Sequence, residues 1–119
     1  LTFVHSTAIV DKSAHIGPGS FIMAGTLIDD HVTIGENVFI QIGCSISHHS
    51  TIKDNCFLGP RVTVAGKVII EENCFLGVGT ILIDTISIAT RVQTGGGAVV
   101  TKSISQAGLY VGIPAKKIK

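Results

Sequence analysis

The side chains that could do acid-base chemistry gather at one repeating position of the sequence. Every eighteenth residue gives one row of mostly polar positions, and the residues that follow give a second: Lys12, Asp30, His48, Gly66 and Asp84, then Ser13, His31, His49, Lys67 and Thr85. If residues 18 apart are spatial neighbours, His48 lies between Asp30 and Gly66. A histidine beside a carboxylate and an exposed backbone N–H can accept a proton from a nucleophile and stabilise an oxyanion. The alternative is a solvated row of polar residues at a surface corner.

The 18-residue spacing belongs to a repeat that runs through most of the chain. Its clearest markers are the five phenylalanines: Phe3, Phe21, Phe39, Phe57 and Phe75. Within this period, aliphatic residues recur every six positions from Val4 to Val100, and only Thr94 breaks the register. Small or β-branched residues stand two positions before most of the aliphatic ones, as in a short strand with two inward-facing side chains. Because each unit can bury its apolar side only by stacking on the next, the pattern predicts a solenoid.

Turn-forming pairs follow the aliphatic positions, among them Pro18-Gly19 and Asp54-Asn55. Such residues supply tight turns and tolerate positive φ. Three hexapeptides per period therefore predict a triangular cross-section with three strands and three corners. The register continues to about residue 104 without an insertion. We expect an all-β parallel β-helix of about six coils over residues 1–105, and a C-terminal extension over residues 106–119 that closes it.

Composition limits the classes of function. Hydrophobic residues make up 45% of the 119 residues and charged residues 14%, which indicates a folded chain. The net charge of +1 offers no broad basic surface for nucleic acid. No apolar run is long enough to span a bilayer and no charged-then-apolar leader is present, so we expect a soluble cytoplasmic protein without a membrane partner. The three cysteines occupy small inward positions and are expected to be packed, reduced thiols.

The residue before each aliphatic position should face outward, so one outer face becomes a ladder of the five phenylalanines. A second face carries Ile9, Leu27 and Ile81. Apolar stripes of this length exceed what soluble monomers normally expose. We therefore expect an oligomer that buries the phenylalanine ladder or the neighbouring face. The alternative is that the rings fold along the surface and cover only the edges of their own coils.

Two segments add a resemblance to the repeat pattern. Residues 46–54 (ISHHSTIKD) and 110–117 (YVGIPAKK), together with the hexapeptide register, resemble the left-handed β-helix acyltransferases. Within them the chain is most similar to sugar O- and N-acetyltransferases, which include sialic acid O-acetyltransferases and bacterial nucleotide-aminosugar N-acetyltransferases. The resemblance implies a single-stranded left-handed parallel β-helix. The left hand comes only from the resemblance, because strand crossovers are right-handed in about 98% of cases.

The resemblance also implies a homotrimer whose active sites lie in clefts between subunits, with acetyl-CoA along the helix. It places the catalytic histidine on His48 and the amide that holds the acyl oxygen on Gly66. His49 and Gln41 are candidate substrate contacts. Besides Gly66, the implied cofactor contacts lie late in the chain: Gly95, Gly96, Gly97, Gly112, Pro114, Ala115, Lys116 and Lys117. The two lysines would meet phosphates. The alternative for the three consecutive glycines is a tight closing corner.

The chain departs from the family pattern at three positions. The acidic residue that often follows the catalytic histidine is His49, the usual glycine after the next aliphatic is Lys53, and a second histidine often found further on is replaced by Phe57. Asp30, one turn before His48, is expected to replace the missing carboxylate as a hydrogen-bond partner. These relatives commonly carry a small nucleotide-binding α/β domain before the β-helix, which this sequence does not include.

We therefore expect acetyl transfer from acetyl-CoA to a sugar amine or hydroxyl, with the amino sugar favoured. His48 would act as general base in direct attack on the thioester, without an acyl-enzyme. One alternative is a non-catalytic trimeric scaffold or binding module. Another is a γ-class carbonic anhydrase, in which three histidines from neighbouring subunits bind zinc. Lys53 and Asp54 stand where the second histidine of that set would lie, so no metal is expected.

Overall fold

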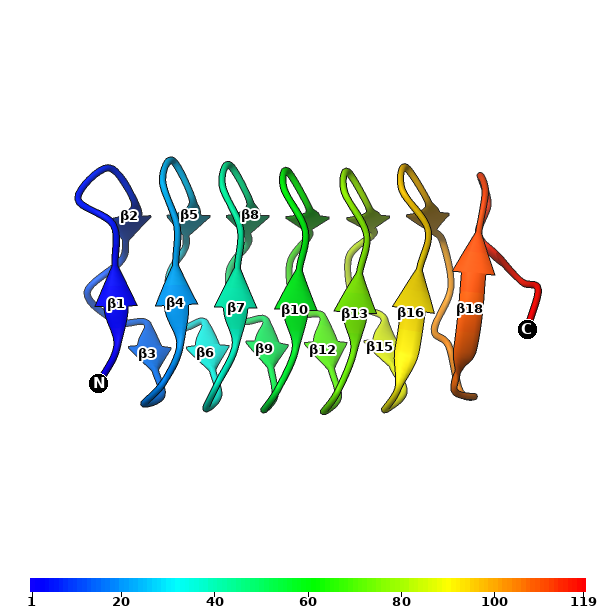
Figure 1. Cartoon of the computed structure of the whole chain (residues 1–119), viewed down its shortest axis with the longest axis horizontal. Helices are drawn as coiled ribbons and strands as arrows, with labels where there is room; N and C mark the ends of the chain where they lie inside the picture. The colour runs from blue at the N-terminus through cyan, green and yellow to red at the C-terminus, as the bar shows by residue number, and fades with distance from the viewer.

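The computed structural model describes residues 1–119, which form β-strands and turns without a helix. The chain winds as a solenoid with extents of 37 × 21 × 20 Å. In Figure 1 it rises on the near side, crosses over the top to the far side and advances from left to right, which makes the coil left-handed. The predicted all-β, parallel β-helix is confirmed. No helix is present that is long and apolar enough to cross a membrane.

Three sheets form the three faces of the solenoid. Sheet A contains β1 (Phe3–Val4), β4 (Phe21–Ile22), β7 (Phe39–Ile40), β10 (Phe57–Leu58), β13 (Phe75–Leu76), β16 (Val92–Thr94), β18 (Gly108–Val111) and β19 (Lys116–Lys117). Sheet B contains β2 (Ile9–Val10), β5 (Leu27–Ile28), β8 (Ser45–Ile46), β11 (Thr63–Val64), β14 (Ile81–Leu82) and β17 (Val99–Val100). Sheet C contains β3 (His15–Ile16), β6 (Thr33–Ile34), β9 (Thr51–Ile52), β12 (Ile69–Ile70) and β15 (Ser87–Ile88). Up to Val100, successive coils pair in parallel with residues 18 apart in register, as Phe3 does with Phe21. After Val100 the spacing shortens to 16 residues, since Ile104 pairs with Ile88 and Gly108 with Val92, so the register ends slightly earlier than the expected residue 104.

The six-residue register forms the core. Its aliphatic residues from Ile22 to Ile88 are each at most 1% exposed. The small or β-branched residue two positions earlier is buried beside each of them, as with Ser20 and Val38. Burying one such aliphatic side chain contributes roughly 1.5–3 kcal/mol. Val4 stays exposed because its coil is covered on one side only. This stacked core fixes the position of every corner.

The polar residue that interrupts the register, Thr94, is buried with its hydrogen bonds satisfied. Its hydroxyl lies 2.7 Å from the hydroxyl of Thr80 and accepts the Gly77 N–H at 3.1 Å. The free cysteines are also buried in the stack. The thiol of Cys44 donates to the Gly59 carbonyl at 3.2 Å, and burial raises the pKa of this thiol. These side chains therefore serve packing.

The corners use left-handed backbone, as their residue types predict. Asn37, Asn55 and Asn73 have φ of 56°, 62° and 63°. The corner between sheets A and B, here the AB corner, contains residues 24–25, 42–43, 60–61, 78–79 and 96–97. The corner between sheets B and C, here the BC corner, contains residues 30–31, 48–49, 66–67, 84–85 and 102–103. Side chains in one corner row are stacked along the solenoid.

A C-terminal hairpin covers the last coil, at the right of Figure 1. β18 pairs in parallel with β16, and β19 folds back antiparallel onto β18. The connecting segment crosses the end of sheet B, where Val99 N–H donates to the Gly112 carbonyl at 3.0 Å and Ala115 N–H donates to the Val99 carbonyl at 2.8 Å. Tyr110 packs against the core. The hairpin thereby seals the apolar end of the stack.

Candidate active site

His48 and His49 lie at the BC corner, in the turn that joins β8 to β9. Backbone hydrogen bonds hold this turn between its neighbours. His49 N–H donates to the Asp30 carbonyl below it at 3.0 Å, and Lys67 N–H donates to the His48 carbonyl from the coil above at 3.0 Å. His49 and Lys67 both have positive φ, at 60° and 57°. The same corner geometry therefore recurs in successive coils and stacks their side chains.

The ring of His48 lies against Gly66. A methyl group on Gly66 would come within 2.7 Å of His48 Nε2 and 3.0 Å of Cε1, so the close approach of the ring requires glycine. The Gly66 carbonyl accepts from Thr85 N–H at 2.9 Å, whereas the Gly66 N–H makes no hydrogen bond within the chain. The structure thus places an imidazole beside an unpaired backbone donor, the combination that a base and an oxyanion site need.

His49 is the hydrogen-bond partner of His48. Their Nδ1 atoms lie 3.1 Å apart, and the two rings meet edge to face with centroids 5.3 Å apart. One of these nitrogens must carry the shared proton. When His48 Nδ1 donates to His49, a neutral His48 has its Nε2 free to accept a proton. His49 can therefore fix the tautomer of the candidate base.

Asp30 has a different partner from the one expected. Its Oδ2 lies 3.0 Å from His31 Nδ1, and this hydrogen bond holds the pKa of Asp30 below its usual value. The expected hydrogen bond to His48 is not formed, because the adjacent His31 presents a nearer imidazole. The His31 ring in turn stacks on His49, with centroids 4.9 Å apart and planes 5° apart. Asp30 reaches His48 only through these two histidines.

Several expected contact residues lie at the AB corner, on the opposite edge of sheet B. Gly95 to Gly97 form the turn between β16 and β17, and Gln41 leaves β7 toward the same corner. A methyl group on Gly95 would meet Val111 Cγ1 at 2.9 Å, so this glycine lets the C-terminal segment pack. One chain therefore does not bring these glycines to His48, nor Gln41 to His49.

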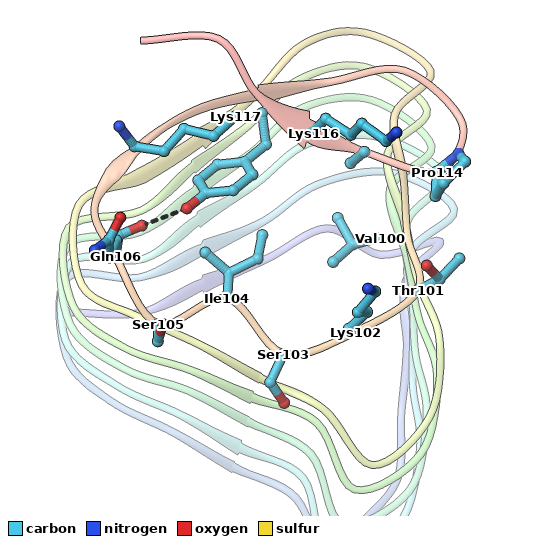
Figure 2. A pocket seen from close by; sticks show the side chains of 12 residues that line it. Val100, Thr101, Lys102, Ser103, Ile104, Ser105, Gln106, Pro114, Lys116 and Lys117 are labelled. Atoms are coloured by element: carbon cyan, nitrogen blue, oxygen red, sulfur yellow. Dashed lines mark hydrogen bonds between the residues drawn. The ribbon is translucent and has the colours of Figure 1, made fainter.

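The largest cavity, of about 500 Å³, lies away from His48, between the last coil and the C-terminal hairpin (Figure 2). Pro114 to Lys117 line it, as do Lys102 and Ser103 of the BC corner. Figure 2 shows Lys116 and Lys117 projecting toward opposite ends of the cavity. The structure thus brings both expected phosphate-binding lysines to one hollow, while His48 itself lies on an open corner.

Lys102 was not among the residues singled out from the sequence. The signal was present, because Lys102 continues the 18-residue row of Asp30, His48, Gly66 and Asp84. It stands three coils beyond His48, which at about 4.8 Å per coil places it roughly 14 Å further along the same corner. Lys102 therefore lies at the same corner as the candidate base and borders the end cavity.

A second unforeseen cation, Arg61, lines a smaller hollow of about 440 Å³ at the AB corner. Its neighbours in the corner row are glycines one coil below and one coil above, Gly43 and Gly79. The aliphatic part of Arg61 covers Gly43, with Cγ 3.5 Å from a methyl group placed there. Arg61 is thus the one positive side chain in a row that is otherwise glycine from Gly25 to Gly97.

Two family models match the chain. Residues 31–66 match the bacterial transferase hexapeptide (six repeats), and residues 67–102 match the hexapeptide repeat of succinyl-transferase. Together they cover more than half of the chain. Among curated proteins, no significant match was found.

Solved structures of three enzymes superpose closely. GDP-perosamine N-acetyltransferase from Caulobacter crescentus, a His-to-Ala variant with CoA and GDP-perosamine, has a TM-score of 0.98 and 32% identity over 100% of this chain and 57% of that one. The acetyltransferase domain of PglB from Neisseria gonorrhoeae, with acetyl coenzyme A, has a TM-score of 0.96 and 25% identity. The match covers 98% of this chain and 57% of that one. AntD, an N-acyltransferase from Bacillus cereus, has a TM-score of 0.93 over 98% of this chain and 78% of that one. Its identity of 20% means that this match supports the fold alone.

This chain spans 57% of the length of the first two proteins. Its coils, its repeat models and its likeness to these structures agree on one assignment. The chain belongs to the bacterial transferase hexapeptide family.

Proposed function

We propose that this chain is an acetyl-CoA-dependent acetyltransferase that N-acetylates a nucleotide-linked amino sugar. The observation that carries the proposal is the contact between the His48 ring and Gly66 at the BC corner. Support also comes from the similar enzymes, one of which was crystallised with CoA and GDP-perosamine as His-to-Ala and His-to-Asn variants. A second, from Neisseria gonorrhoeae, was solved with acetyl coenzyme A.

The proposed reaction is direct acyl transfer. The sugar amine attacks the thioester carbonyl carbon, and His48 Nε2 accepts the proton that the nitrogen loses. The carbonyl oxygen becomes an oxyanion, which the Gly66 N–H would hold in this proposal. The carbonyl then re-forms as the C–S bond breaks, and the CoA sulfur takes the proton from His48 and leaves as the thiol. General-base assistance is worth about 10²- to 10⁴-fold, and one oxyanion donor about 10²- to 10³-fold.

Acetyl-CoA is proposed to lie along the BC corner from Gly66 to the end cavity. Its thioester would be at His48, and its phosphates at Lys102, Lys116 and Lys117, which border the end cavity. Ammonium groups suit phosphates as compact charges. The separation of roughly 14 Å from the base to Lys102 is one that the extended pantetheine arm can cover. The position of base, glycine and lysine in one corner row supports this path.

The open position of His48 favours a site completed by a second copy. Gln41, Gly95 to Gly97 and Arg61 lie at the AB corner, which one chain keeps apart from the BC corner. We propose that three copies assemble so that an AB corner faces a BC corner across each cleft. In that arrangement the glycines leave backbone open to the cofactor, and Gln41 can reach the acceptor.

The proposal is tested by an acetyl-transfer assay with acetyl-CoA and a panel of nucleotide-linked amino sugars that includes GDP-perosamine. Release of free CoA thiol and addition of one acetyl group by mass spectrometry should both depend on the acceptor. The His48→Asn variant should be slower by about 10²- to 10⁴-fold. Acetylation of a hydroxyl alone would assign an O-acetyltransferase. Absence of both turnover and CoA binding would instead identify a non-catalytic scaffold.

A further inference from the structure

The BC corner carries more coordinating groups than the proposed acyl transfer uses. Asp30, His31 and His49 each offer one ligand atom, and these atoms lie within 4.8 Å of one another. Two imidazoles and one carboxylate suit Zn²⁺, Ni²⁺ or Cu²⁺ and are a poor set for Mg²⁺. We propose that these three side chains bind one divalent transition-metal ion, with Zn²⁺ as the reference ion, and that the bound ion inactivates the neighbouring base.

The geometry requires only small movements for coordination. Zinc binds nitrogen and oxygen ligands at about 2.0–2.2 Å, so two ligands of one ion are at most about 4.4 Å apart. The observed limit of 4.8 Å lies just outside this range. The rings of His31 and His49 are nearly parallel and must tilt toward a common ion, which the broad χ2 torsion of histidine permits. His31 and Asp30 have side chains 63% and 44% exposed, so packing does not oppose the tilt.

The backbone already holds the ligands in place. His49 N–H donates to the Asp30 carbonyl at 3.0 Å, which fixes the two coils in register at the ligand positions. The Asp30 carboxylate is also engaged with an imidazole nitrogen of His31 at 3.0 Å, a distance close to that between adjacent ligands of one ion. A site formed this way loses little backbone entropy on binding, because the stacked coils have already ordered the ligands.

Coordination of His49 through Nε2 changes its partner His48, since the hydrogen bond at 3.1 Å already occupies Nδ1 of His49. If Nε2 binds, neutral His49 carries its proton on Nδ1 and becomes a donor to His48. His48 Nδ1 must then accept, which puts the His48 proton on Nε2, the atom proposed to receive the substrate proton. This second half of the inference rests on the proposed function; metal binding itself does not.

Binding is tested on the full chain without a polyhistidine tag, after treatment with EDTA. Calorimetric titration with ZnCl2 should give one ion per chain, and MgCl2 should give none. Loss of an outer-shell partner weakens metal affinity about 10- to 100-fold, so His31→Ala, which removes a ligand, should weaken it at least as much. His15→Ala removes an exposed imidazole of sheet C and should leave the affinity unchanged. Equal affinities for wild type and His31→Ala, or no zinc binding, would overturn the site.

The coupling to His48 is tested by two readouts. Saturating Zn²⁺ should slow acetyl transfer by about 10²- to 10⁴-fold in the wild type, whereas His31→Ala at the same Zn²⁺ concentration should keep its rate. The ¹⁵N imidazole signals of His48 should report a tautomer change on zinc addition in the wild type but not in His31→Ala. Zinc binding that leaves these signals and the rate unchanged would refute the coupling. If the metal-free protein shows no acetyl transfer, the proposed function is contradicted. The zinc titration and the ¹⁵N signals then still decide whether the metal site and its effect on His48 exist.

Discussion

At the scale of single residues, His48 is defined by two contacts on opposite sides of its ring. Nε2 approaches Gly66, and Nδ1 faces His49 at 3.1 Å. An imidazole that donates from one nitrogen to a fixed acceptor presents the other nitrogen as a base. The neighbour in the chain thus does for His48 what a carboxylate does for many catalytic histidines.

Replacing His48 should therefore affect chemistry more than binding. His48→Ala should lower kcat by about 10²- to 10⁴-fold with CoA affinity little changed, because a general base acts in the transition state. His49→Ala should cost less, since it removes only the group that orients the base. Steady-state kinetics and CoA titration separate these effects. Acetylation at wild-type rates by both variants would exclude the assignment.

Gly66 gives an independent test of the same contact. Gly66→Ala places a methyl group 2.7 Å from His48 Nε2, and the ring must move because the backbone around Gly66 is held by the coil stack. Gly66 lies outside the positive-φ positions, so alanine causes no backbone strain there. We expect a melting temperature close to wild type and a loss of activity of about 10²-fold or more, as for loss of a general base, because the displaced ring no longer holds its position. Wild-type activity would show that the contact is not catalytic.

The sequence predicted which residues are neighbours at the BC corner but not how their side chains pair. An 18-residue period determines that Asp30, His48 and Gly66 share a row. It does not determine torsion angles, and Asp30 therefore pairs with His31 in the second row. The stacked rings of His31 and His49 follow from the same repeat, because the second row aligns one histidine over another. Row membership was predictable; hydrogen-bond choice was not.

At the scale of elements, each strand is too short to fix the position of a corner side chain without its neighbouring coils. Most strands contain two residues, and their register comes from pairing with the coils on either side. The period and residue types made this architecture predictable. The sequence showed that Thr94 interrupts the aliphatic register, but it did not show how its buried hydroxyl is satisfied. Its partner Thr80 lies 14 residues away, which is not a multiple of the repeat. The C-terminal hairpin has no repeat either, which is why the cavity that it forms with the last coil was not foreseen.

The end cavity can be tested through CoA binding. Lys102→Gln should weaken CoA affinity while kcat at saturating CoA stays near wild type, because a phosphate contact acts equally in ground and transition states. At 100 times its Kd, CoA should stabilise the wild type by about 2.7 kcal/mol in thermal unfolding. Lys12→Gln, in the same corner row but toward the other end, is the matched control. Equal loss of CoA affinity in both variants would place the phosphates elsewhere.

At the scale of the whole molecule, the outer faces are unequal. The five phenylalanines of sheet A stack on one another, with centroids 6.0, 5.7, 5.6 and 4.8 Å apart along the ladder. Stacking covers part of each ring, yet Phe3, Phe21 and Phe75 remain between 44% and 48% exposed. Sheet B adds Ile9, Leu27 and Ile81, which are also exposed. Sheet C carries mostly polar residues such as Thr33. The apolar surface thus lies on two adjoining faces.

We expect a trimer in which contacts between copies bury the phenylalanine ladder of sheet A or the apolar face of sheet B. Apolar burial contributes about 25 cal/mol per Å², so several aromatic and aliphatic side chains can drive association. Light scattering at micromolar concentration should give three times the chain mass of 12.4 kDa. Phe57→Glu tests the ladder and Leu27→Glu tests sheet B, while Thr33→Glu on sheet C is the matched control and should remain trimeric. Activity should fall together with trimer content, because each proposed cleft needs corners from two copies. A wild-type monomer that is fully active would contradict both the assembly and the shared site.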